Sequence, residues 1–166
     1  MKTTYPTRTV TINDIDELRN LFRSTIQAVN IQNYTPAEIE DWASCGDSTI
    51  HWKNLLSTLY FLAALDSEGR IIGFASIRAD GYLHSMFVHK DWQRKGIASQ
   101  LLSEIEAYAC RFGITQITSE VSITARPFFE KQGYSVEKSQ KKRAKRLEMI
   151  NYVMKKRTIK TSICEF

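Results

Sequence analysis

The stretch from Gly81 to Phe112 constrains the fold most, because a strand pattern changes into a helix pattern within it. Residues 82–88 are rich in β-branched and aromatic side chains and predict a strand. After a short polar turn, apolar residues recur every three to four positions from Ile97 to Phe112, and Gly113 follows them. This spacing predicts an amphipathic helix that ends at the glycine.

The junction between this strand and this helix favours binding of an anion. Gly96 and Ala98 are small residues at the helix start, where they leave backbone N–H groups uncovered. Phosphate is the natural ligand of such a helix start. Arg94 and Lys95 would add cationic donors, as expected for a diphosphate. The alternative is an ordinary helix start with two solvated basic residues.

Two motifs, in the right order, resemble the GNAT superfamily of N-acetyltransferases. Gln93-x-x-Gly96-x-Ala98, which follows Met86-Phe87-Val88-His89, is similar to the family's acyl-CoA-binding signature. The segment 125–134, with Phe129-Glu130-Lys131 and Gly133-Tyr134, resembles its later helix-and-strand motif. The resemblance covers residues 8–157. It implies an α/β GNAT fold, with a mixed and mostly antiparallel sheet of about six to seven strands flanked by about four helices.

The resemblance implies transfer of an acetyl group from acetyl-CoA to a primary amine of a small molecule, peptide or protein. The amine would attack directly in a ternary complex. The pantetheine would lie along residues 86–88, with the thioester carbonyl near the Phe87 N–H, and the diphosphate would lie on residues 94–99. The residues expected at the cofactor are Met86, Phe87, Val88, Gln93, Arg94, Lys95, Gly96, Ile97, Ala98, Ser99, Ser122, Thr124 and Phe128.

His84 is the candidate general base that removes the amine proton. Strand alternation places it on the same face as Met86, and the ordinary histidine pKa of about 6.5 suits the task. Tyr82 could continue a proton relay, and Glu120 is the second candidate. The alternative for His84 is a structural, hydrogen-bonded histidine.

One position departs from the family pattern. Many GNAT enzymes carry a tyrosine that protonates the leaving thiolate, and Phe129 stands there in this chain. Because phenylalanine has no proton to donate, Ser122, Thr124, Tyr134 or Tyr152 would supply it, or solvent would assist. The departure leaves open a non-catalytic acyl-CoA-binding sensor.

The first two helices are expected to form the wall of the acceptor site in a GNAT fold. Residues 13–29 and 35–43 predict these helices, the second through the capping box of Thr35 and Glu38 with Pro36 at its start. The candidate acceptor contacts are Tyr34, Trp42 and Tyr152. Tyr34 and Trp42 could equally be core residues.

The remaining patterns complete a single acetyltransferase domain at residues 1–157, followed by a tail at 158–166. Strands are expected at 8–12, 59–65, 70–78, 116–121, 134–141 and 147–156, and a helix ends at Gln132. Residues 46–57 are ambiguous, with a hint of a short helix. The apolar tail residues could pack on the body or on a second subunit, so a homodimer is left open.

Composition indicates a cytoplasmic protein without a membrane segment. No apolar run approaches the ~20 residues of a membrane span, and the start has no signal-peptide core. Cys45, Cys110 and Cys164 lack metal-ligand spacing, which predicts reduced thiols and no metal site.

The net charge of +5 is concentrated partly in the basic hairpin at residues 141–146. An RNA- or ribosome-associated acetyltransferase is one explanation of this hairpin. A solvated hairpin is favoured, so a nucleic acid partner is not expected. Attraction of a polyanionic cofactor is a third explanation.

Overall fold

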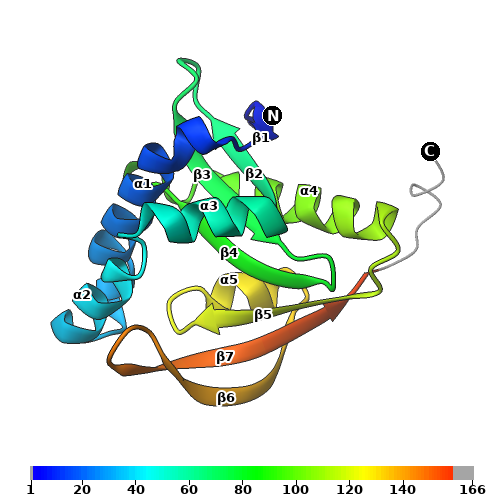
Figure 1. The fold of residues 1–166 in the computed structure, drawn as a ribbon. Helices are drawn as coiled ribbons and strands as arrows, with labels where there is room; N and C mark the ends of the chain where they lie inside the picture. The colour runs from blue at the N-terminus through cyan, green and yellow to red at the C-terminus, as the bar shows by residue number, and fades with distance from the viewer. Residues whose placement is uncertain (1, 159–166) are drawn as a thin grey trace.

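The protein, described by a computed structural model over residues 2–158, consists of seven strands, five α-helices and three short 3₁₀ helices (Figure 1). The strands are β1 (Thr7–Thr9), β2 (Tyr60–Leu65), β3 (Ile71–Ile77), β4 (Tyr82–Val88), β5 (Gln116–Ser122), β6 (Ser135–Arg143) and β7 (Glu148–Arg157). The α-helices are α1 (Ile15–Ala28), α2 (Pro36–Ser44), α3 (Thr49–Thr58), α4 (Ile97–Arg111) and α5 (Arg126–Lys131). The 3₁₀ helices are η1 (Ile12–Asp14), η2 (Asn30–Gln32) and η3 (Lys90–Trp92).

The strands form one sheet in the order β1-β2-β3-β4-β5-β7-β6. The β4–β5 pair is parallel, and every other neighbouring pair is antiparallel. This confirms the predicted α/β architecture with a mixed, mostly antiparallel sheet. The parallel pair brings together two strands that the chain joins through α4.

Helices cover both faces of the sheet because successive strand residues point to opposite sides. Phe61 and Phe74 pack in one cluster with Leu18 of α1 and Trp52 of α3. The opposite face packs against α4 and α5 in a second cluster, built from the alternate strand residues. Its members include Leu62, Ala75, Leu101, Ile105 and Phe129.

Local signals place the first helices, with one change. The capping box of α2 is present, and Thr35 Oγ1 accepts the Glu38 N–H at 3.2 Å. The ambiguous segment contains α3, which Ser48 caps. The first strand is shorter than predicted, since buried Asp14 accepts hydrogen bonds from Arg8 and from the Thr11 N–H and turns the chain at η1.

The prediction of reduced cysteines is wrong at one position. Cys45 is a free thiol, whereas Cys110 on α4 is disulfide-bonded. The tail from residue 159 onward, including Cys164, lies outside the described residues. Within residues 2–158, every helix is too short or too polar to cross a membrane.

Candidate active site

The parallel strands β4 and β5 pair at one end and then diverge. Their register contains Tyr82 opposite Thr118 and Leu83 opposite Ser119, and no further pair. A cavity of about 760 Å³ extends along the gap. Its lining comes from both faces of the sheet, with Phe22 and Trp42 on one side and Ile97 and Phe128 on the other. The divergence of two strands therefore opens a passage through the sheet.

The free edge of β4 presents the backbone of Met86 and Val88 to this gap. The His89 N–H bonds to the Ile72 carbonyl, so the Phe87–Phe74 pair, two residues along, is also a hydrogen-bonded pair of the antiparallel ladder. Residues between such pairs direct their N–H and C=O groups to the other edge. The register thus places the Met86 and Val88 N–H groups at the gap, and not the Phe87 N–H as expected.

Two side chains donate hydrogen bonds to the Val88 carbonyl. Gln93 Nε2 donates to it at 2.6 Å and Thr25 Oγ1 at 3.1 Å. Gln93 therefore ties the turn after β4 to the end of the strand. The Val88 N–H and both backbone groups of Met86 remain at the open edge.

The turn before α4 has the backbone geometry of an anion-binding loop. Arg94 has φ of 60° and Gly96 has φ of 83°, both in the left-handed region that favours glycine. Gly96 precedes the first residue of α4, so the N–H groups of residues 97–99 lack helical partners. Arg94 lines the cavity. Lys95 does not, because its ammonium group lies over the Trp92 ring, 5.3 Å from the ring centroid.

Across the cavity from the Gly96 turn lies the loop between β5 and α5. Ser122 Oγ accepts the Ala125 N–H at 3.1 Å and so begins this turn. Thr124 lines the cavity, and its buried hydroxyl has no hydrogen-bond partner within residues 2–158. Phe129, at the position of the family's tyrosine, is 4% exposed in the core.

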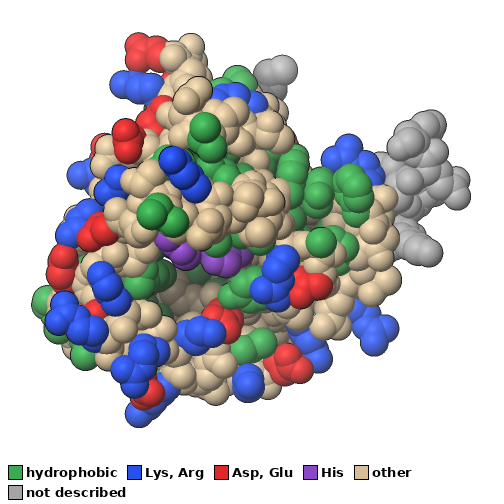
Figure 2. Space-filling model, viewed as in Figure 1, with side chains coloured by type: hydrophobic (Ala, Val, Ile, Leu, Met, Phe, Trp, Pro, Cys, Tyr) green, Lys and Arg blue, Asp and Glu red, His purple; other side chains and the backbone are tan. Residues whose placement is uncertain are grey.

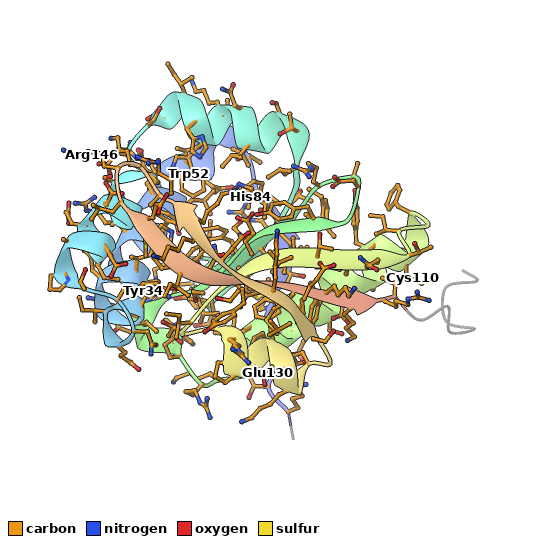
Figure 3. All side chains as sticks on the ribbon, turned by 90° about the horizontal axis from the view of Figure 1, so that it is seen from below. Tyr34, Trp52, His84, Cys110, Glu130 and Arg146 are labelled. Atoms are coloured by element: carbon orange, nitrogen blue, oxygen red, sulfur yellow. The ribbon has the colours of Figure 1, made fainter. Side chains whose placement is uncertain are left out.

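His84 lies at a β-bulge, which changes the face that its side chain occupies. Leu83 and Met86 both pack into the α4 cluster although three positions separate them. The register shifts at this point, with Ser85 opposite Ser76 and Leu83 opposite Ile77. His84 therefore does not share a face with Met86, as strand alternation predicted, and it lines the cavity on the side of α3 together with Trp52 (Figure 3).

The environment of His84 favours the neutral imidazole. Desolvation by the cavity walls, and then the charges of His51 and Arg78, lower the pKa of His84. The ring nevertheless stays open to solvent in the hollow. Figure 2 shows histidine side chains at the edge of this hollow. A neutral imidazole can accept a proton.

Tyr82 and Glu120 lie on the same side of the gap as His84. The Tyr82 and His84 ring centroids are 6.1 Å apart. Desolvation, and after it the nearby Glu120 carboxylate, raise the pKa of Tyr82 to about 12. Lys142 Nζ lies 3.1 Å from Glu120 Oε1. Tyr82 thus stays protonated at neutral pH, and Glu120 is charge-paired.

Aromatic residues of α2 and of the segment before it line the end of the cavity that the sequence assigned to the acceptor. The Trp42 ring contacts Tyr34 at 5.7 Å and Phe87 at 6.3 Å between centroids. The Tyr34 hydroxyl donates to the Ile150 carbonyl at 2.7 Å and accepts the Ile123 N–H at 2.9 Å. Tyr34 is therefore a bridge between β7 and the β5–α5 loop as well as part of the wall.

Tyr152, by contrast, is outside the cavity lining. It packs with the α4 cluster, and the Arg126 guanidinium lies over its ring at 4.4 Å. The structure therefore separates it from Tyr34 and Trp42, with which the sequence grouped it. Tyr134 is also used elsewhere, because its hydroxyl bonds to Glu106 at 3.1 Å.

Asp41, which the sequence analysis missed, attaches the basic hairpin to α2. Its Oδ2 accepts the backbone N–H groups of Lys145, Arg146 and Leu147 at 2.9, 2.8 and 2.9 Å. These bonds lower the pKa of the Asp41 carboxyl, and the bond from the Leu147 N–H has the largest effect. Arg146 lies beside α2 in Figure 3. The hairpin thereby closes the end of the cavity near Tyr34 and Trp42, and Lys142 and Arg143 line the cavity.

An open strand edge that leads to an anion-binding helix start is the arrangement expected of an acyl-CoA-dependent acyltransferase. The chain belongs to the GNAT family of acetyltransferases, because residues 30–156 match the family described as "Acetyltransferase (GNAT) domain". It is therefore an acetyltransferase, and such enzymes use an amine acceptor. Within the described residues, no group of three His, Cys, Asp or Glu side chains could hold a metal ion.

Relatives agree with this membership. YafP of Escherichia coli K12, named an uncharacterized N-acetyltransferase, is 29% identical over 142 residues, which cover 86% of this chain and 89% of YafP. A GCN5-related N-acetyltransferase structure from Rhodopseudomonas palustris has a TM-score of 0.91 at 24% identity, covering 95% of this chain and 98% of that chain. The PaiA N-acetyltransferase of Thermoplasma acidophilum, solved with coenzyme A, has a TM-score of 0.76 at 20% identity, covering 93% and 99%. These likenesses confirm the GNAT fold.

Proposed function

We propose that this protein transfers the acetyl group of acetyl-CoA to a primary amine by direct attack in a ternary complex. The observation that carries the proposal is the single cavity between β4 and β5. It connects the open edge at Met86 and Val88 and the turn at Gly96 with His84 on the other face of the sheet.

The cofactor would occupy the gap as an added strand. Its pantetheine amides would pair with the Met86 backbone and the Val88 N–H. The diphosphate would accept N–H groups from residues 97–99, with Arg94 as the mobile cation beside it. Gln93 would act by holding the turn against Val88.

The chemistry at the acetyl group needs one base and one set of donors. The amine nitrogen attacks the thioester carbonyl carbon, its N–H proton passes to neutral His84, and the C–S bond breaks. An N–H on the open β4 edge would stabilise the oxyanion. The Thr124 hydroxyl, a donor without a partner in the described residues, would hydrogen-bond the departing thiolate in place of the absent tyrosine.

One observation favours a second function. Phe129 is buried in the core where the family's tyrosine would stand, so an acyl-CoA-binding sensor without turnover remains the alternative. The two functions differ in product formation and not in cofactor binding. A single domain at residues 1–157, a cytoplasmic location and a homodimer stay predictions.

The test combines thiol release with product detection. Purified protein is incubated with acetyl-CoA and a panel of primary amines, while free CoA thiol is followed by colour and acetylated amines by mass spectrometry. We expect amine-dependent thiol release that matches acetyl-amine formation. Tight acetyl-CoA binding with no thiol release on any amine would favour the sensor, and absence of binding would contradict both.

A further inference from the structure

We propose that the acceptor amine carries an anionic group, a carboxylate or a phosphate, which Arg143 binds. This inference rests on the proposed function, because it names the substrate class of the same site. The charges that line the cavity support it.

The cavity lining is strongly cationic at both ends. Within the described residues, Glu120 is the sole carboxylate among the side chains that line it. Arg94 and Lys131 lie at the cofactor end, and Lys142 and Arg143 lie on the hairpin. Figure 2 shows Lys and Arg side chains gathered around the hollow. The diphosphate accounts for the cations at one end only.

Two carboxylates near the acceptor end already have partners. Glu120 is paired with Lys142 at 3.1 Å, and Asp41 accepts three backbone N–H groups. Arg143 is different, since no carboxylate within residues 2–158 pairs with it. Its Nη1 donates to the Arg146 carbonyl at 3.2 Å, which leaves most of its five N–H donors for a ligand.

The hairpin and the diphosphate turn lie on opposite faces of the sheet. Asp41 ties the hairpin to α2, which packs with α1, whereas α4 and α5 cover the other face. An anion at Arg143 is therefore separate from the cofactor phosphates. Guanidinium pairs with carboxylate and phosphate through two parallel bonds, so this position suits either group.

A cationic acceptor end also helps the reaction. Positive charge beside an ammonium group lowers its pKa, and the reactive form of the acceptor is the neutral amine. By the same argument, a polycation would be repelled, because Glu120 is the one lining carboxylate within residues 2–158 and is already paired.

The experiment compares amines of different charge, with the benzoate and the benzamide as the matched pair. The probes are 4-(aminomethyl)benzoate, 4-(aminomethyl)benzylphosphonate and the neutral 4-(aminomethyl)benzamide, with spermidine as the polycation. Their kcat/KM values are measured, and calorimetry with CoA present measures their binding. We expect an anionic probe to exceed the benzamide roughly tenfold in both measurements, as for loss of a charge-assisted hydrogen bond. The preferred anion identifies carboxylate or phosphate as the ligand.

Arg143→Gln should remove this preference, so that the ratio of kcat/KM for the anionic probe to kcat/KM for the benzamide falls to about 1 while acetyl-CoA affinity stays the same. Arg157→Gln, at the exposed end of β7, is the matched control and should keep the preference. Equal use of anionic and neutral probes, a preference for spermidine, or weaker acetyl-CoA binding in Arg143→Gln would each overturn the inference. Selective anion binding without thiol release would instead refute the proposed acetyl transfer and leave the anion site standing.

Discussion

The two ends of the cavity are built differently. The cofactor end rests on one continuous stretch, residues 86–99, in which strand, turn and helix start follow one another, and the β5–α5 loop adds its far wall. The acceptor end is assembled from distant segments, and hydrogen bonds of two side chains hold them together. Asp41 binds residues 145–147, and Tyr34 binds Ile123 and Ile150. One substitution can therefore change the shape of the cofactor end, whereas the acceptor end depends on the hydrogen bonds that join its segments.

The largest effect is expected where the two ends meet, at His84. His84→Gln should lower kcat by about 10²- to 10⁴-fold, because it removes the proposed general base. Acetyl-CoA affinity should not change. In the unmodified protein, kcat/KM should fall as the pH drops through the pKa of His84, which desolvation by the cavity walls, His51 and Arg78 lower, and the variant should lack this acid limb.

His51→Gln is the matched control, because His51 also lines the cavity. It should keep the acid limb of the pH profile, moved toward higher pH because His51 helps to lower the pKa of His84. A profile that stays unchanged in His84→Gln would contradict the assignment of the base.

The cofactor end should break at Gly96. Gly96→Val should weaken acetyl-CoA binding about 100-fold, since a β-branched residue will not hold the φ of 83° that shapes the turn. The measurement is calorimetric titration. Gly69→Val is the control, because Gly69 has φ of 79° in the β2–β3 turn, far from the cavity. Equal affinities in the two variants would argue against the phosphate turn.

The acceptor end should loosen when Asp41 loses its charge. Asp41→Asn keeps an acceptor for the hairpin N–H groups but makes the bonds neutral, so we expect acceptor KM to rise roughly 5- to 10-fold at constant acetyl-CoA affinity. The pKa of Asp41 is lower in the folded protein than its ordinary value. The stability that the charged carboxylate gives to the hairpin tie is therefore fully present above the ordinary carboxyl pKa, and it is lost as the pH falls through the folded pKa. The KM of the unmodified protein should thus show no dependence on Asp41 near neutral pH.

Asp66→Asn separates this effect from general destabilisation. Asp66 Oδ1 similarly accepts the Glu68 and Arg70 N–H groups, both at 2.9 Å, in the turn between β2 and β3. Its replacement should lower the melting temperature without changing acceptor KM. A KM increase in both variants would show that the hairpin tie is not specific.

The smallest effect is expected at Tyr34. Tyr34→Phe removes the hydroxyl that bridges Ile123 and Ile150 and should cost about 1 kcal/mol of unfolding free energy. Urea denaturation measures this loss, and acceptor KM should rise a few-fold. Tyr60→Phe, which retains the ring stack on Tyr108, should change neither value.

This difference also decides what the sequence could predict. The turn at Gln93 and Gly96 and the strand before it were predicted, because residues close in the chain determine them. The Asp41 tie was not, because its partners are more than a hundred positions away. The bulge at His84 has no signal in the sequence, and it reversed the face on which strand alternation placed this residue.

Aromatic residues were the least predictable group. In the sequence, Tyr34, Trp42 and Tyr152 are alike in being aromatic residues that could contact an acceptor. The sheet, however, places Tyr152 on the face that packs against α4, away from the acceptor end of the cavity. Lys95 is a similar case, since its place beside Arg94 did not bring it to the cavity. Adjacent residues in a strand or turn point in different directions, and only the register fixes which one reaches the site.

Amide hydrogen exchange, followed by NMR with and without acetyl-CoA, tests the central claim most directly. The account predicts that Met86, Val88 and residues 97–99 exchange quickly in the free protein and become protected by the cofactor. Phe87 should be protected in both states, because its N–H faces β3. Protection of the hairpin amides at residues 145–147 by acetyl-CoA, with no change at Met86 and Val88, would contradict a cofactor bound between β4 and β5.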